Sequence, residues 1–211
     1  MRGGRFSIAL CGTVLLGAFV AAPAGSIEVF GTLPPPEYGK TVNVGPVSGV
    51  VRVRLPGGEK SFVLSSELQV QVGAIIDTSE GRVRLTSAKG PGGGPSQSAD
   101  FFEGRFKVLQ PRGGSPVTVL KLANPVVCGN KSSRASASHS RPRGLWGSGT
   151  GNFRSEGRHG SATVRGTIWW AQDRCDGTKF KVKRGVVAIR DFTNHTTVKL
   201  HKGETYLAPV G

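Results

Sequence analysis

Hydrophobic and polar residues alternate in short runs along most of the chain. Residues 68–72 (LQVQV) alternate at every position, and residues 82–86 (RVRLT) place Val and Leu on one face and the two arginines on the other. A period of two is what a β-strand with one buried face shows. Residues common in turns separate the runs. The pattern predicts strands at residues 47–55, 61–64, 68–72, 75–78, 82–86, 101–109, 117–122, 152–154, 162–165, 167–172, 179–183, 186–191, 198–200 and 206–207.

No segment after residue 24 carries a convincing apolar stripe of helical period, so the fold class expected is all-β. We expect one domain, residues 42–211, built from about a dozen short antiparallel strands and arranged as a sandwich or as stacked hairpins resembling a solenoid. Residues 25–41 contain three consecutive prolines and read as an irregular leader. Residues 130–151 are rich in Ser, Gly and Arg and are predicted to form a flexible basic loop.

The N-terminal pattern differs from the rest. A short cationic start precedes an uncharged apolar run at residues 6–20, and Ala22-Pro23-Ala24 follows with small residues. This order is typical of a secretory signal peptide at residues 1–24, because the run is shorter than the roughly 20 residues that span a bilayer. An uncleaved membrane anchor is the alternative. We expect a secreted or cell-surface protein with no transmembrane span in the mature chain.

Two cysteines, Cys128 and Cys175, follow the signal peptide. An even number of cysteines in an oxidising compartment favours one disulfide between them. Free thiols are the alternative. A zinc site would require histidine ligands at short spacing, and none accompany these cysteines, so we expect no metal.

The positive charge of the chain is concentrated in its second half. Residues 25–103 contain 7 Lys and Arg against 8 Asp and Glu, whereas residues 104–211 contain 19 against 5. A one-sided basic field favours anionic partners, although it can also be a solvated surface that keeps the protein soluble. The candidate anion-binding residues are Lys131, Arg134, Arg141, Arg143, Arg154, Arg158 and Arg165.

Aromatic side chains are interleaved with these cations, as on surfaces that bind single-stranded nucleic acid. Trp146 is one candidate aromatic contact. The expected compartment makes nucleic acid an improbable physiological partner, so teichoic acid, phospholipid head groups, acidic glycans or another envelope protein are the partners considered. Arginine suits phosphate because its planar fork binds two oxygens at once.

The adjacent tryptophans Trp169 and Trp170 must point to opposite faces of their strand. We favour Trp170 or Ile168 for the core. That choice leaves Trp169 as the second candidate aromatic contact, a recognition anchor if it is exposed.

No catalytic motif is found in the chain. The patterns of P-loop proteins, of the strand–turn–helix serine hydrolases and of the HExxH zinc proteases are all absent from the sequence. We therefore expect a protein without catalytic residues or cofactor. A secreted enzyme with a dispersed Ser/His/Asp site is the alternative.

Several short motifs resemble those of FecR-type domains. Residues 48–58 (SGVVRVRLPGG) and 70–88 (VQVGAIIDTSEGRVRLTSA) are similar to the N-terminal part of that family, and residues 164–207 to its C-terminal part. The C-terminal matches are Val164, Gly166, Thr167, Gly185, Val186, Val187, Gly203 and Glu204. The resemblance implies a periplasmic or surface domain that senses signals, acts as a scaffold or recognises a partner. The chain departs from the family's regulators, since it lacks their cytoplasmic segment and transmembrane helix, so signalling to a sigma factor is not expected.

Overall fold

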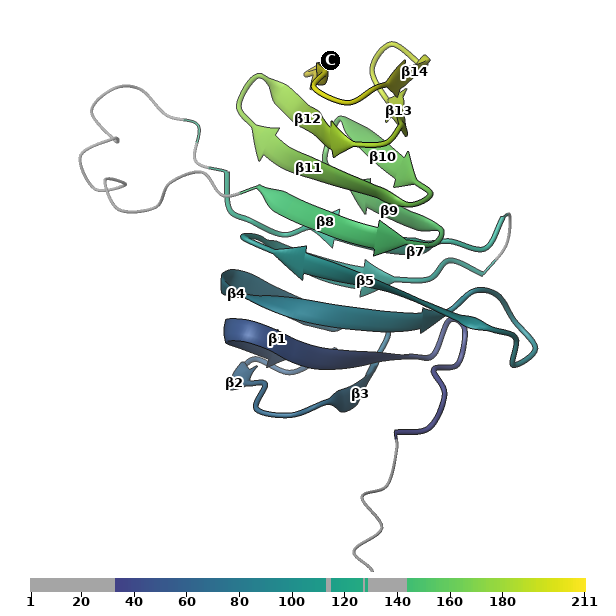
Figure 1. The fold of residues 1–211 in the computed structure, drawn as a ribbon. Coiled ribbons are helices and arrows are strands. Elements are labelled where there is room, and N and C mark those ends of the chain that lie inside the picture. Colours follow the sequence, from purple (N-terminus) through teal and green to yellow (C-terminus); the bar gives the residue numbers. More distant parts are fainter. Residues whose placement is uncertain (1–32, 113–114, 127, 129–143) are drawn as a thin grey trace, which may run out of the picture. The chain divides into compact units, whose positions relative to one another are not determined.

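The computed structural model describes residues 33–112, 115–126, 128 and 144–211. These residues form an all-β unit within Leu33–Gly211 that contains fifteen strands, which confirms the predicted fold class (Figure 1). The strands are β1 (Thr41–Arg54), β2 (Phe62–Val63), β3 (Leu68–Gln71), β4 (Ile75–Ala88), β5 (Ser96–Phe102), β6 (Arg105–Leu109), β7 (Thr118–Leu122), β8 (Leu145–Thr150), β9 (Phe153–Glu156), β10 (Gly160–Val164), β11 (Thr167–Arg174), β12 (Gly177–Arg184), β13 (Val187–Asp191), β14 (Thr197–Leu200) and β15 (Thr205–Pro209).

The strands form one hydrogen-bonded sheet that folds over on itself at β4. The first residues of β4 pair with β6 and its last seven pair with β5. From there the sheet continues in two directions. We call β5, β8, β11, β12 and β15 the front layer, and β6, β7, β9, β10, β13 and β14 the back layer (Figure 1). All strand pairs are antiparallel except β7 with β9.

Two glycines form the bend that lets β4 belong to both layers. Gly49 of β1 pairs with Gly81 of β4, and the register shifts on both sides of this pair. Gly49 has φ of 65°, and a Cβ on Gly81 would lie 2.7 Å from the carbonyl oxygen of Ser48. Only glycine tolerates these two conditions. Residues 75–78 and 82–86, expected as separate strands, are therefore one bent strand held along its length by β1.

The hydrophobic core lies between the two layers. Phe101 of β5 is at its centre, with ring centroids 5.4 Å from Phe106, 5.6 Å from Phe153 and 6.0 Å from Trp169. All four side chains are at most 1 % exposed, and they come from both layers. Tilted and edge-on arrangements of this kind are favourable for aromatic rings.

The predicted flexible loop is wrong over its last residues. Residues 145–150 form β8, which pairs with β5 on one side and β11 on the other. Glycine normally weakens a strand. Here Leu145 is fully buried, and the missing side chain of Gly147 leaves room for an indole ring, so glycine serves the packing. Residues 129–143 lie outside the described part of the chain.

The signal peptide and residues 25–32 also lie outside the described residues. The remainder of the predicted leader, residues 33–40, contains no strand, and its Pro34 carbonyl accepts hydrogen bonds of 3.0 Å from Asn43 and Gln69. Over the ranges that are described, no helix is both long and apolar enough to span a bilayer.

Candidate functional site: a basic cleft between the layers

The structure describes three of the seven predicted anion-binding cations. Lys131, Arg134, Arg141 and Arg143 lie outside the described residues. Arg154 is half-buried on β9, and its Nε donates a hydrogen bond of 3.2 Å to Thr163 Oγ1. Arg158 and Arg165 are exposed at opposite ends of the β9–β10 hairpin. These three side chains therefore do not form one cluster.

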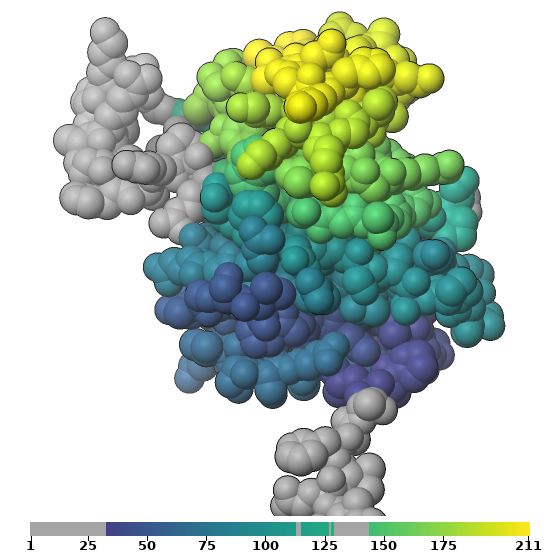
Figure 2. All heavy atoms as spheres, in the orientation of Figure 1, coloured from purple at the N-terminus to yellow at the C-terminus, as the bar shows by residue number. Residues whose placement is uncertain are grey.

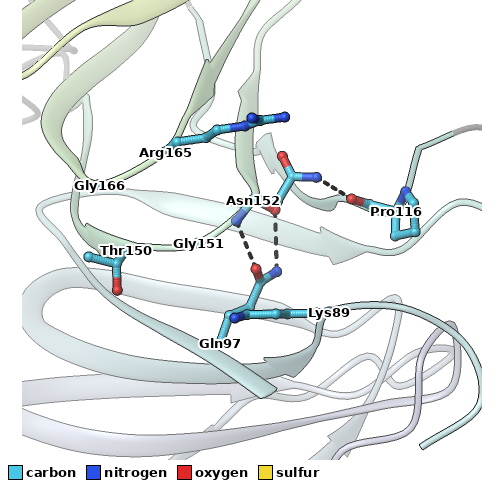
Figure 3. A pocket seen from close by; sticks show the side chains of 8 residues that line it. All are labelled: Lys89, Gln97, Pro116, Thr150, Gly151, Asn152, Arg165 and Gly166. Atoms are coloured by element: carbon cyan, nitrogen blue, oxygen red, sulfur yellow. Dashed lines mark hydrogen bonds between the residues drawn. The ribbon is translucent and has the colours of Figure 1, made fainter. Parts of the chain in front are cut away.

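Arg165 lines a cleft that the sequence did not predict. The cleft has a volume of about 510 Å³ and opens where the turns after β8 and β10 carry the chain from one layer to the other. A second cation, Lys89, lines it from the segment that follows β4 (Figure 3). Its lining residues are Lys89, Gln97, Pro116, Thr150, Gly151, Asn152, Arg165 and Gly166.

The amide groups in this cleft are bonded to one another. The Asn152 backbone N–H donates to Gln97 Oε1 at 2.7 Å, and Gln97 Nε2 donates to the Asn152 carbonyl at 3.3 Å. The Asn152 side-chain amide donates to the Pro116 carbonyl (Figure 3). The exposed cations Lys89 and Arg165 are the charged donors that the cleft offers to a ligand. A pair of cationic donors suits an anionic group.

Behind the cleft, a buried polar network joins the layers. Thr118 of β7 lies 2.8 Å from the Ser87 hydroxyl and accepts hydrogen bonds from the side-chain amides of Gln97 at 3.2 Å and Gln110 at 3.0 Å. All four residues are buried. A network whose members are bonded fixes a unique packing, so it holds the cleft walls in place.

The structure corrects the assignment of the adjacent tryptophans. Trp169, predicted as the aromatic contact, is 1 % exposed, and its Nε1–H donates to Ser155 Oγ at 2.9 Å across the core. Trp170 and Ile168, the two residues favoured for the core, both point outward and are half-buried. The reason is the neighbouring strand: a Cβ on Gly147 would lie 2.3 Å from the Trp169 indole, so the inner face has space for that ring. Trp146 lies outward and half-buried, as a surface contact requires.

The acidic groups of the C-terminal half are mostly occupied by local partners. Asp173 accepts hydrogen bonds from the Arg158 backbone N–H at 2.9 Å and from Thr178 at 2.6 Å. Asp191 is fully buried and bonded to Thr193, Asn194 and Tyr206. These carboxylates are bonded to neutral donors, and neither of them forms an ion pair with a described basic side chain.

Burial would raise the pKa of the Asp191 carboxyl. The hydrogen bonds that it accepts from Asn194, Tyr206 and Thr193 outweigh burial and lower its pKa. The same contact with Asp191, together with burial, raises the pKa of Tyr206. Asp191 is therefore a charged structural group.

The ion pairs between described residues are distributed unevenly between the two halves of the chain. Four of the five ion pairs between described residues lie within residues 37–100. Over the continuous stretch 144–211 there is one, between Arg174 and Asp176. Most basic side chains of this stretch thus remain available to an external anion.

The sequence did not identify Lys89, because it lies in the half of the chain that carries no net positive charge. The lysines of β12 were also missed as candidates. The alternation of residues 179–183 could have shown them, since Phe180 and Val182 face the core and Lys179 and Lys181 face outward.

Metal-ligating side chains do not cluster in the part of the chain that the structure covers. No three His, Cys, Asp or Glu residues come close enough there to hold an ion. The disulfide is confirmed: Cys128 and Cys175 are bonded, with Cα atoms 5.5 Å apart and a sequence separation of 47. A disulfide is compatible with an oxidising, extracytoplasmic environment. No family model, curated protein or solved structure matches the chain.

Proposed function

We propose that this protein is a non-catalytic extracytoplasmic recognition module that binds an anionic polymer at the cell surface. The observation that carries the proposal is the basic C-terminal half, where Arg174 is the one described cation with an ion-pair partner among the described residues. One ion pair within residues 144–211 leaves most of its lysines and arginines free to contact phosphate or carboxylate groups.

The cleft contributes a defined contact point to this surface. Lys89 and Arg165 line it, and the bonded amides of Gln97 and Asn152 fix its shape. Because the guanidinium of Arg165 is exposed, it can bind two oxygens of one anionic group. The cleft therefore suits a repeating unit or a terminal group of such a polymer.

A FecR-like role as a scaffold or recognition domain agrees with this proposal. The matching motifs are spread over residues 42–207, and the resemblance implies a surface domain that senses, acts as a scaffold or recognises a partner. We propose no signalling partner on the basis of this resemblance.

The test is binding of the disulfide-bonded protein to inorganic polyphosphate and to polygalacturonate, measured by calorimetry between 50 and 300 mM salt. Contact with several anionic groups predicts that the logarithm of the affinity falls steeply and linearly with the logarithm of the salt concentration. Absence of binding to both polymers at 50 mM salt would refute the proposal.

Charge reversal in the cleft is the matched comparison. The double substitution Lys89→Glu with Arg165→Glu is expected to weaken polymer binding by about tenfold or more, equivalent to about 1.4 kcal/mol. The control is Lys40→Glu with Lys60→Glu, which changes the net charge equally at exposed positions outside the basic half. Equal losses in the two variants would mean that the cleft has no special part in binding.

A further inference from the structure

We propose that a row of outward aromatic side chains on the front layer binds the sugar rings of an acidic polysaccharide. The row consists of Phe102, Trp146 and Trp170, with Arg82 at one end and Lys181 at the other. This inference rests on the proposed function and names the chemical class of the polymer.

Strand register places these five residues in line across five strands. Arg82 of β4 is paired with Phe102 of β5, and Phe102 with Trp146 of β8. Trp146 is paired with Trp170 of β11, and Trp170 with Lys181 of β12. Adjacent strands are about 4.8 Å apart, so the row crosses roughly 19 Å of the sheet surface. Figure 1 shows β5, β8, β11 and β12 as consecutive strands on the viewer's side.

All three rings lie on the outer face. Each follows a buried residue in its strand: Phe101, Leu145 and Trp169 are at most 1 % exposed. The rings of Phe102 and Trp146 have centroids 6.1 Å apart and planes within 8° of parallel. Trp146 and Trp170 are 6.4 Å apart and tilted by 49°. Their half-buried side chains therefore make a continuous apolar strip. Figure 2 shows this side of the molecule with all heavy atoms drawn as spheres.

Close packing holds the strip in position. A Cβ on Gly144 would lie 2.1 Å from the Trp170 indole, so that ring rests directly on backbone. The guanidinium carbon of Arg82 lies 4.0 Å from the centroid of the Phe102 ring. A preorganised aromatic surface loses little side-chain entropy when a ligand binds.

Cations flank the strip on both sides. Arg82 and Arg84 share one carboxylate, Asp100, at 3.7 and 2.9 Å, so two guanidinium groups face a single carboxylate at that end. At the other end, Lys179 and Lys181 point outward from β12 and belong to none of the ion pairs between described residues. The surface therefore combines apolar rings with peripheral positive charge.

An acidic polysaccharide matches this combination. The C–H face of a pyranose ring is apolar and flat enough to lie on an indole ring such as that of Trp146 or Trp170, where it buries apolar area. Carboxylates at the edges of such rings would reach Arg82 or Lys181. Nucleobases could also stack on these side chains, but the Cys128–Cys175 disulfide favours an oxidising compartment, where surface glycans are found.

Aromatic neighbours can also serve sheet stability alone, through cross-strand pairing. That role predicts that substitution lowers the melting temperature and leaves the preference between polymers unchanged. The experiment must therefore compare polymers of equal charge type, with and without sugar rings.

We would measure the affinity of the disulfide-bonded protein for polygalacturonate, for polyphosphate and for poly-dT at one salt concentration. The variants are Trp146→Ala and Trp170→Ala, with Phe192→Ala as control, since Phe192 is an exposed aromatic at the end of β13, away from the row. Each tryptophan variant is expected to lose about tenfold in polygalacturonate affinity and to keep polyphosphate affinity within about twofold. The control should change neither.

Two further variants keep the test informative if a tryptophan-to-alanine variant does not fold. Trp146→Phe retains an aromatic ring and should preserve most polygalacturonate binding. Lys181→Glu leaves the rings intact and should weaken polygalacturonate binding, because it removes a cation from the end of the row.

The outcomes separate this inference from the proposed function. Unchanged polygalacturonate affinity in the folded tryptophan variants, or equal losses for polygalacturonate and polyphosphate, would overturn the role of the row while anionic binding stands. Tighter, tryptophan-dependent binding of poly-dT would show that the row accepts bases in place of sugars and would also overturn it. If the wild-type protein bound none of the three polymers, the proposed function would itself fail.

Discussion

Glycine decides which tryptophan enters the core. Gly147 faces the interior, and the Trp169 indole occupies the space where its side chain would be. The indole N–H then reaches Ser155 in the opposite layer, so a buried polar group is satisfied. One small residue on β8 thus sets the orientation of its neighbour β11, and with it the outward position of Trp170.

Gly147→Ala is therefore expected to destabilise the protein by about 1–3 kcal/mol, the usual cost of overpacking a core. Urea unfolding followed by tryptophan fluorescence measures the change. Gly94→Ala is the control, because Gly94 has no atom within 4 Å of its would-be Cβ and no positive φ. Equal stability of the two variants would contradict the packing explanation.

At the scale of elements, a buried carboxylate and a disulfide connect segments of the C-terminal half. Asp191 ends β13 and accepts hydrogen bonds from the turn residues Thr193 and Asn194 and from Tyr206 of β15. It therefore connects the ends of the back and front layers. The disulfide ties the β11–β12 turn to Cys128.

The Asp191 carboxyl predicts an acid-dependent stability. Its folded-state pKa is lowered, so the unfolded chain binds the proton more readily. The stabilisation is complete above the unfolded pKa of about 3.9 and is lost as the pH falls through the lower folded value. Asp191→Asn should lower the melting temperature at pH 7 and flatten its decline below about pH 4.

Melting temperatures between pH 7 and pH 2 test this expectation. Asp176→Asn is the control, since Asp176 is exposed and bonded to Arg174. If Asp191→Asn declined with pH as steeply as the control, the carboxylate would not be the acid-sensitive group.

Removal of the disulfide should lower the free energy of unfolding by about 4 kcal/mol, the chain-entropy value for a loop of this length. The double substitution Cys128→Ser with Cys175→Ser, unfolded in urea, measures the loss. A change below about 1 kcal/mol would show that this loop is already restricted in the unfolded chain.

At the scale of the whole molecule, the basic residues of the two halves of the chain differ in whether they have ion-pair partners. In the N-terminal half, Arg52, Arg82 and Arg84 pair with acids on neighbouring strands. In the C-terminal half, Asp173 and Asp191 accept hydrogen bonds from neutral donors instead of pairing with described cations. The described cations of residues 144–211 therefore have few ion-pair partners, and at physiological salt exposed charges act over about 8 Å.

Charge reversal should accordingly depend on location. Lys183→Glu with Lys199→Glu is expected to elute from a cation-exchange column at clearly lower salt than Lys40→Glu with Lys60→Glu, although both lower the net charge by the same amount. Identical elution would indicate that net charge alone governs adsorption.

Periodicity and composition predict the all-β fold class and the strands with strict alternation, and the cysteine count favours the disulfide over free thiols. Alternation reports directly on one buried face, so residues 68–72 and 179–183 were recognised as strands. The two cysteines after residue 24 allow only one pairing with each other. The basic character of the second half is likewise a property of composition.

The remaining features depend on contacts between segments that are far apart in the sequence. Residues 145–150 become a strand because β5 and β11 pair with both of their edges, and no local pattern records that. Trp169 is buried because Gly147 lies beside it across strands, and the Arg82–Lys181 row exists because register aligns five distant segments. Such features depend on which strands become neighbours, and pairing between residues far apart in sequence leaves no periodic trace in either segment.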